Sequence, residues 1–305
     1  MDNLKIEISK KTKNFRHNWM LFLIISFGVL FVFIYFLILS PKRNEDVLIH
    51  ISPKDSLIKV SNDLKEKEVV RHPFLFKIFV RVLSGDKNVS KGDYLFKKGE
   101  NLFGVVFQIV KGNHNVNPIK VTLREGINKE EMAKILADKI KGFNKDLFLN
   151  DERSKEGYLF PDTYFFYSLS TTNEILDDIN SNFNRKINSL DKDIKSSGKS
   201  LSDIMIMASI LEKEASGKED IGMISGILWK RIKLGMPLQV DVAPITYKEI
   251  GLPDSPIGNP GFLAIYSTLH PVESGYLFYL HDENRQVHYA VDFSEHRSNI
   301  AKYLK

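Results

Sequence analysis

The sequence predicts the α+β fold class, with an N-terminal transmembrane helix, a small β/α module and a larger mixed α/β domain. Three observations support this prediction. Residues 20–39 form an uncharged apolar run, strand patterns at 47–51 and 119–123 each precede a helical pattern, and residues 201–215 have strong helical periodicity. We therefore expect four segments, which are residues 1–18, 19–39, 40–118 and 119–305.

The composition narrows the class of protein. The chain has 305 residues, a formal net charge of +5 and no cysteine, with 43% hydrophobic and 27% charged residues. These values exclude collagen-like and disordered classes. The absence of cysteine excludes a disulfide scaffold, a thiolate zinc site and a cysteine nucleophile. The histidines are scattered, so the sequence predicts no metal site and no cofactor. The basic residues are dispersed and a glycine-rich phosphate loop is absent, which disfavours nucleic acid as a partner.

Residues 20–39 are long enough to cross a bilayer, because about 20 helical residues span the ~30 Å hydrocarbon core. The run ends in bulky Ile38 and Leu39 without the small residues of a cleavage site, which favours an uncleaved anchor over a signal peptide. A buried helix of a soluble domain is the alternative. Basic residues gather before the run, so we expect a cytoplasmic N-terminus and an extracytoplasmic chain from about residue 41.

Local signals predict the elements of the module at 40–118. Alternating apolar residues indicate strands, serine or aspartate begins a helix, and glycine ends one. A strand followed by a helix occurs at 47–65 and again at 119–140. Such pairs are found in small carbohydrate-binding modules, so we predict a LysM-like module. The expected elements are a strand at 47–51, a helix capped by Ser56 or Asp55, a helix at 73–84, a strand at 92–96 and a helix from 102 that ends at Gly112.

The larger domain contains one strong helix and a long stretch rich in proline and glycine. Residues 186–200 are polar and predict a surface connector. Ser200 or Ser202 can cap the helix at 201–215. The proline- and glycine-rich stretch from residue 236 is either an ordered functional loop or a flexible linker. The other expected elements are a strand at 119–123, helices at 129–140 and 221–234, strands at 276–280 and 287–291, and a last helix.

Two carboxylates on the helix at 201–215 are candidates for acid–base chemistry. Glu212 and Glu214 fall at the two edges of its apolar stripe, while Lys213 points away. A carboxyl group set against apolar surface has a raised pKa, which a general acid working near neutral pH needs. Periodicity alone does not choose between the two residues. The alternative is a pair of solvated helix charges near Lys213 and Lys218.

Residues 156–166 are dense in aromatics around a turn at Pro161 and Asp162. Aromatic faces stack on sugar rings and aspartate binds hydroxyl groups, so this segment favours a glycan ligand. A hydrophobic core strand would account for the aromatics but not for the turn.

Four ordered motifs resemble those of one family. Residues 156–164 read EGYLFPDTY, residues 208–214 read ASILEKE, residues 231–241 read RIKLGMPLQVD and residues 251–261 read GLPDSPIGNPG. Each is similar to a motif of the MltG (YceG-like) family of endolytic murein transglycosylases, and the resemblance covers nearly the whole chain. The chain departs from the family at Ala215, where threonine or serine is usual, and in a shorter loop after Asp241.

The resemblance implies a membrane-anchored enzyme that cleaves peptidoglycan strands without water, with Glu214 as general acid and base. The expected reaction cleaves the β-1,4 bond between MurNAc and GlcNAc and leaves 1,6-anhydro-MurNAc ends. Action beside the plasma membrane implies a cut in nascent strands that limits their elongation. Expected partners are peptidoglycan strands, the membrane and peptidoglycan synthases. Residues expected to contact substrate are Glu212, Gln239, Asp241, Tyr247, Asn259, Glu156, Asp162 and Tyr164, with turn geometry as the alternative role of Asn259.

Two other functions stay open from the sequence. A catalytically silent peptidoglycan-binding scaffold would keep the module and the aromatic segment but would not need Glu214. A muramidase hydrolase would pair Glu214 with Asp241 or Glu212, because most glycosidases use two carboxylates. The chemical nature of the product end, anhydro or reducing, distinguishes the lyase from the hydrolase.

Overall fold

The computed structural model describes residues 19–20, 22–32, 35, 41, 43–84, 89–215, 217 and 220–304. The expected cytoplasmic tail and parts of the expected membrane segment lie outside these residues. Within the described ranges, no helix combines the length and the apolar character that a membrane crossing requires. The chain divides into two compact units, Met1–Asn117 and Pro118–Lys305.

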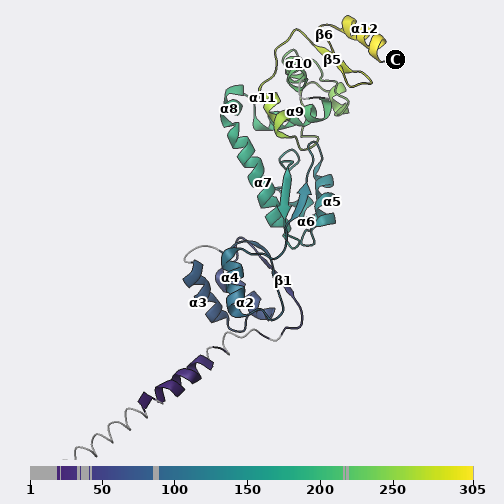
Figure 1. Ribbon diagram of the computed structural model, residues 1–305. Helices are drawn as coiled ribbons and strands as arrows, with labels where there is room; N and C mark the ends of the chain where they lie inside the picture. Colours follow the sequence, from purple (N-terminus) through teal and green to yellow (C-terminus); the bar gives the residue numbers. More distant parts are fainter. Residues whose placement is uncertain are drawn as a thin grey trace, which may run out of the picture. The chain divides into compact units, whose positions relative to one another are not determined.

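The first unit combines a two-stranded antiparallel sheet with short helices (Figure 1). Its elements are β1 (Val47–Ile51), α2 (Leu57–Glu66), α3 (Pro73–Ser84), β2 (Gly92–Phe96) and α4 (Leu102–Lys111), as expected. Strands β1 and β2 pair with Val47 opposite Phe96. Of the two candidate caps, Ser56 begins α2, because its hydroxyl accepts from the backbone amide of the third residue after it. Gly112 ends α4 in the left-handed conformation, with φ of 64°.

The second unit begins with a strand pair and helices that share one apolar core. The elements are β3 (Ile119–Thr122), α5 (Lys129–Lys139), α6 (Lys145–Asn150), β4 (Thr163–Phe166) and α7 (Thr172–Ser189). Strands β3 and β4 are antiparallel, with Val121 opposite Tyr164. Asn128 begins α5 in a capping box with Glu131.

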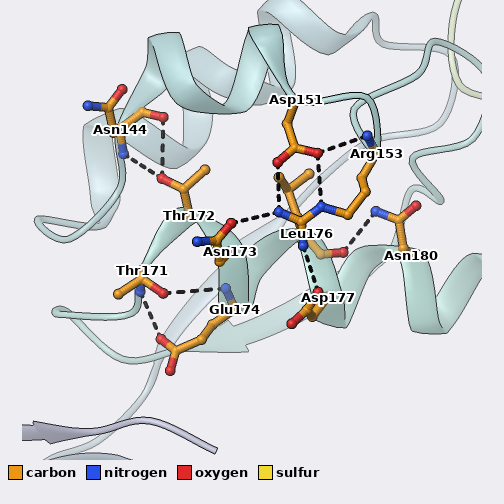
Figure 2. Close-up of polar contacts among 10 residues, drawn as sticks. All are labelled: Asn144, Asp151, Arg153, Thr171, Thr172, Asn173, Glu174, Leu176, Asp177 and Asn180. Carbon is orange, nitrogen blue, oxygen red and sulfur yellow. Dashed lines mark hydrogen bonds and ion pairs between the residues drawn. The ribbon is translucent and has the colours of Figure 1, made fainter. Parts of the chain in front are cut away.

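A cluster around Arg153 joins the loop after α6 to the start of α7 (Figure 2). The guanidinium donates hydrogen bonds of 2.6 Å to Asp151, 2.8 Å to Asp177 and 2.6 Å to Asn173. The hydrogen bond from Arg153 lowers the pKa of Asp151 to about 2. The cluster therefore holds the segment that leads from α6 to Glu156.

The remaining elements pack around α9. They are α8 (Asp191–Ser197), α9 (Leu201–Glu214), α10 (Ile221–Lys233), the 3₁₀ turn η1 (Pro244–Tyr247), α11 (Phe262–Leu269), β5 (Phe278–His281), β6 (Val287–Ala290) and α12 (Phe293–Tyr303). Residues 204–211 of α9 are all buried in a second apolar core. Strands β5 and β6 form an antiparallel hairpin, with Phe278 opposite Ala290. Helices thus combine with small antiparallel sheets, which confirms the mixed α and β character of the expected fold.

The segment at 186–200, predicted as a surface connector, is helical over most of its length. Helix α7 continues to Ser189, and α8 follows it. Ile187, Leu190 and Ile194 recur at helical spacing and pack against the core of α9. The packing of these apolar side chains against the core stabilises a helical segment whose composition is otherwise polar.

Helix α10 holds the segment that leads into β5. The Trp229 indole donates to the Thr268 carbonyl at 3.0 Å, and the Val272 amide donates to the Gly222 carbonyl at 2.9 Å. Gly226 permits this close approach, because a Cβ atom there would lie 1.9 Å from the Val272 carbonyl oxygen. The start of β5 is therefore placed by α10.

Candidate active site

Helix α9 carries two carboxylates in its last turn. The Ser200 hydroxyl accepts from the Asp203 amide and begins the helix, and Ala215 leaves it in an extended conformation with φ of −71°. Glu212 and Glu214 are separated by about 200° around the helix axis. Their side chains therefore enter different surroundings. These surroundings distinguish Glu212 from Glu214 as the candidate general acid, which periodicity alone does not.

Glu214 lines a cavity of about 430 Å³. Its Oε2 accepts a hydrogen bond of 3.1 Å from the Tyr279 hydroxyl. Burial is the largest influence and raises the pKa of Glu214; the hydrogen bond from Tyr279 opposes this shift, and the charge of Asp241 adds to it. A half-buried carboxyl whose pKa is raised and that faces an open cavity is suited to donate a proton.

The loop after α10 forms one wall of the cavity, with Gln239, Asp241 and Tyr247 lining it. The Tyr247 hydroxyl donates to Asp241 Oδ1 at 2.6 Å, and this bond raises the pKa of Tyr247 to about 12. Gln239 has φ of 50°, which is uncommon for a residue other than glycine. Thr246 Oγ1 accepts from the Val240 amide at 3.0 Å and closes the loop. The proline- and glycine-rich stretch is therefore an ordered loop at this point.

A second wall comes from β5 and α12, and Arg231 joins it to the loop. Arg231 is 5% exposed and donates to the Leu277 carbonyl at 2.7 Å and to the Leu238 carbonyl at 2.6 Å. Its guanidinium carbon lies 4.9 Å from the centroid of the Phe278 ring. Arg231 thus fixes both walls and places a buried cation beside an acidic cavity.

Glu212 points to the other side of α9, towards the loop that contains Gly261. Its Oε2 accepts from the Gly261 amide at 2.9 Å. Burial raises the pKa of Glu212 to about 7; the Gly261 hydrogen bond opposes this shift, and the charge of Glu125 adds to it. Gly261 has no space for a side chain, because a Cβ atom there would lie 1.8 Å from Glu125 Oε1. The structure places Glu212 against this loop rather than among the residues that line the cavity.

Asn259 lies fully buried in a polar network, here called the Asn259 knot, that joins three segments of the second unit. Its Oδ1 accepts from the amides of Gly157 and Leu159 at 2.9 and 3.1 Å. Its Nδ2 donates to the Ile127 carbonyl at 3.0 Å and to Glu156 Oε1 at 2.6 Å. These bonds use the full hydrogen-bonding capacity of the amide. Asn259 is therefore buried and Glu156 half-buried, neither residue lines the cavity, and the geometry favours the structural role for Asn259.

Asp162 and Tyr164 lie beside a separate hollow of about 280 Å³ between β4 and α7. Asn182 Nδ2 donates to Asp162 Oδ2 at 3.0 Å and to the Tyr164 hydroxyl at 3.1 Å. The Tyr164 hydroxyl itself donates to the Phe160 carbonyl at 2.6 Å. Of the residues expected to contact substrate, only Gln239, Asp241 and Tyr247 share the cavity with Glu214.

A model of the YceG-like family matches residues 49–245 and 245–302 of the chain. The chain belongs to the YceG-like family. This match spans both units and confirms the family that the four motifs resemble.

Two relatives of this YceG-like chain are named for the same activity. The chain is 26% identical to an endolytic murein transglycosylase of Bacillus subtilis, over 85% of each protein. It is 21% identical to the endolytic murein transglycosylase of Streptococcus pneumoniae (strain D39), over 91% of this chain and 62% of that protein. A crystal structure of a putative YceG-like protein from Listeria monocytogenes has a TM-score of 0.54 and 22% identity, covering 84% of this chain and 99% of that one. The structural likeness supports the fold.

Two residues of this YceG-like cavity do not follow from sequence patterns. Tyr279 lies in a hairpin that is predicted only as two strands, and its contact with Glu214 joins residues 65 positions apart. Arg231 begins the motif at 231–241, yet periodicity assigns it no role. The one available signal is that Arg231 occupies a buried position of α10, where an arginine needs partners.

Proposed function

We propose that this YceG-like protein is a peptidoglycan lytic transglycosylase, a lyase that cuts glycan strands internally. The observation that carries this proposal is the Glu214 carboxyl, half-buried at the end of α9 and open to the cavity. The relatives named endolytic murein transglycosylases support the substrate class and the reaction type. The aromatic side chains of Phe278 and Phe293 add apolar surface to the polar groups of the cavity, a combination that suits a sugar ring.

Glu214 acts twice in the proposed reaction. Protonated Glu214 gives its proton to the glycosidic oxygen between MurNAc and GlcNAc, and the bond from that oxygen to C1 breaks. The resulting carboxylate takes the proton of the MurNAc 6-hydroxyl, whose oxygen forms a new bond to C1. The products are a GlcNAc-bearing strand and a 1,6-anhydro-MurNAc end, and Glu214 is protonated again. Negative charge on Asp241, held by Tyr247, stabilises the positive charge that develops on the sugar.

A muramidase hydrolase is the second candidate, because Asp241 shares the cavity with Glu214. In that reaction Asp241 would activate water or attack the sugar. Glu212 is the weaker partner for such a pair, since its carboxylate binds the Gly261 amide outside the cavity. A silent scaffold would have no use for a proton donor in an open cavity.

We further propose that the protein is a single-pass plasma-membrane protein with an extracytoplasmic catalytic domain at 119–305. The support is the uncharged apolar run at 20–39 and the basic residues before it. The module at 40–118, whose strands β1 and β2 flank α2 and α3, is proposed as a LysM-like glycan-binding module. This placement beside the membrane suits a cut in nascent strands that ends their elongation, near peptidoglycan synthases.

The test is product analysis on uncrosslinked glycan strands, with the wild-type protein and Glu214→Gln in detergent. Mass spectrometry separates anhydro ends from reducing ends, which are heavier by one water. Anhydro ends from the wild type alone support the lyase. Reducing ends support the hydrolase, and an absence of products from the wild type, with strands still bound, supports the scaffold.

A further inference from the structure

Helix α3 is apolar on two opposite faces, although the first unit covers only one of them. Phe76 and Val80 are 0% and 2% exposed and belong to the core of the unit. Phe74, Ile78 and Val82 are 69%, 39% and 74% exposed. These three residues follow one another at intervals of four, so they form a single stripe along the outer face of the helix. A helix with apolar residues all round is normally covered on every side.

Positive charge lies along one edge of this stripe. At about 100° per residue, Arg81 falls ~20° and Lys77 ~60° to one side of Phe74 around the helix. Helix α3 contains no acidic residue, and Arg71 precedes it by two positions. Apolar side chains bordered by lysine and arginine are the pattern of a helix that lies in the interface of a bilayer with anionic lipids.

The proposed membrane anchor keeps α3 near such a surface. Residues 40–46 connect the apolar run to β1, and seven residues reach at most about 25 Å when fully extended. The first unit is therefore confined to a layer next to the bilayer, where its outer surfaces meet lipid headgroups repeatedly. A protein partner would have to compete with this permanently present surface.

We propose that the outer face of α3, formed by Phe74, Ile78 and Val82, inserts into the headgroup region of the membrane while Lys77 and Arg81 contact anionic lipid headgroups. This inference rests on the proposed membrane anchor. The occupant of the stripe is the bilayer, and the contact gives the first unit a second attachment point besides the anchor. With two attachment points, the first unit can adopt fewer orientations relative to the membrane.

The absence of cysteine makes the test direct, because each single cysteine introduced is the sole labelling site. Full-length variants Phe74→Cys and Val82→Cys carry an environment-sensitive nitrobenzoxadiazole label in nanodiscs containing phosphatidylglycerol. Leu147→Cys, an exposed apolar position of α6 that is 48% accessible, is the water-exposed control. Phe27→Cys reports on the anchor itself. Lipids with spin labels at the headgroup or deep in the acyl chain quench the fluorescence according to depth.

We expect headgroup spin labels to quench residues 74 and 82 at least about twofold more than residue 147, and Lys77→Gln with Arg81→Gln to reduce this quenching. Equal quenching at 74, 82 and 147, with strong acyl-chain quenching at 27, overturns the inference and leaves the anchor standing. No quenching at 27 overturns the anchor and the inference with it. A blue-shifted emission at 74 and 82 without lipid quenching means that protein, a second copy or another partner, covers the stripe, and it also overturns the proposal.

Discussion

Glu212 and Glu214 leave the same turn of α9 and enter regions of different construction. Around Glu212 and the Asn259 knot, backbone amides donate to Glu212 Oε2 and to Asn259 Oδ1, and Gly261 has no space for a side chain. Around Glu214, the Tyr279 hydroxyl and the Val242 backbone amide donate to a carboxyl that faces a cavity. Burial raises the pKa of both glutamates. A raised pKa therefore does not by itself identify a catalytic acid; access to substrate makes the difference.

The largest expected effect comes from exchanging the two glutamates separately for glutamine. Glu214→Gln removes the only proposed proton carrier, so the rate of anhydro-end release should fall by about 10³-fold. Glu212→Gln keeps an acceptor for the Gly261 amide and should retain activity within about threefold. Timed digestion with mass spectrometry measures both rates, and thermal unfolding checks that both variants fold. An inactive Glu212→Gln beside an active Glu214→Gln would reverse the assignment.

The Asn259 knot should respond in stability. Asn259→Ala leaves the amides of Gly157 and Leu159 and Glu156 Oε1 without this partner, so the free energy of unfolding should fall by about 3–4 kcal/mol. The Ile127 carbonyl keeps its bond from the backbone amide of residue 259. Asn180→Ala is the matched control, because that side chain makes one bond, to the Leu176 carbonyl, and should cost about 1 kcal/mol or less. Urea unfolding measures both. A stable Asn259→Ala protein that no longer binds glycan would instead assign Asn259 to the substrate.

Tyr279→Phe should separate positioning from proton transfer. The hydroxyl donates to Glu214 and lowers its pKa relative to burial alone, so its removal raises that pKa further. The activity that requires protonated Glu214 should therefore persist to higher pH, while the maximal rate falls about tenfold because the carboxyl is less well oriented. The pH profile of the cleavage rate tests this, with Tyr266→Phe on α11 as control. A profile that moves to lower pH would contradict the hydrogen-bond argument.

The smallest expected effect concerns pH and stability. Glu212 has a pKa of about 7 in the folded chain and an ordinary value of 4.5. Between these values the folded chain holds a proton that the unfolded chain has released, so stability falls as pH rises towards 7. Glu212→Gln removes this loss and should gain about 1–2 kcal/mol over wild type at pH 8, after allowance for solvent screening, and almost nothing at pH 4. Urea unfolding at both pH values measures the gain; an equal difference at the two would argue against the shift.

Sequence patterns predict those parts of the molecule that depend on local signals. Alternation gives the strands at 47–51 and 92–96, and capping residues such as Ser200 give the helix starts. The helical segment at 186–200 is not predicted from the sequence, because its structure depends on three apolar residues among many polar ones. Tertiary contacts are needed to bring such a segment onto the core, and no local signal reports them.

The candidate site shows the same limit. Gln239, Asp241 and Tyr247 lie close together along the chain, so one motif and its flank place them on one wall. Asn259 and Glu156 have the residue types of sugar-binding groups, yet their partners are backbone atoms far away in sequence. Tyr279 reaches Glu214 only through the placement of the hairpin against α10. Residue type alone does not distinguish a side-chain amide that binds a ligand from one whose hydrogen bonds connect segments of the same chain.

The approach of α10 to Val272 at Gly226 has a consequence for how variants of this chain would be classified. Even the methyl group of alanine at position 226 would displace the Val272 carbonyl, and with it the strand that carries Tyr279. Gly226→Ala would then register in an activity screen beside the catalytic mutants, although the residue contributes no atom to the cavity lining. A genetic survey should therefore find inactivating substitutions where α10 approaches the chain around Val272, as well as among the residues that line the cavity.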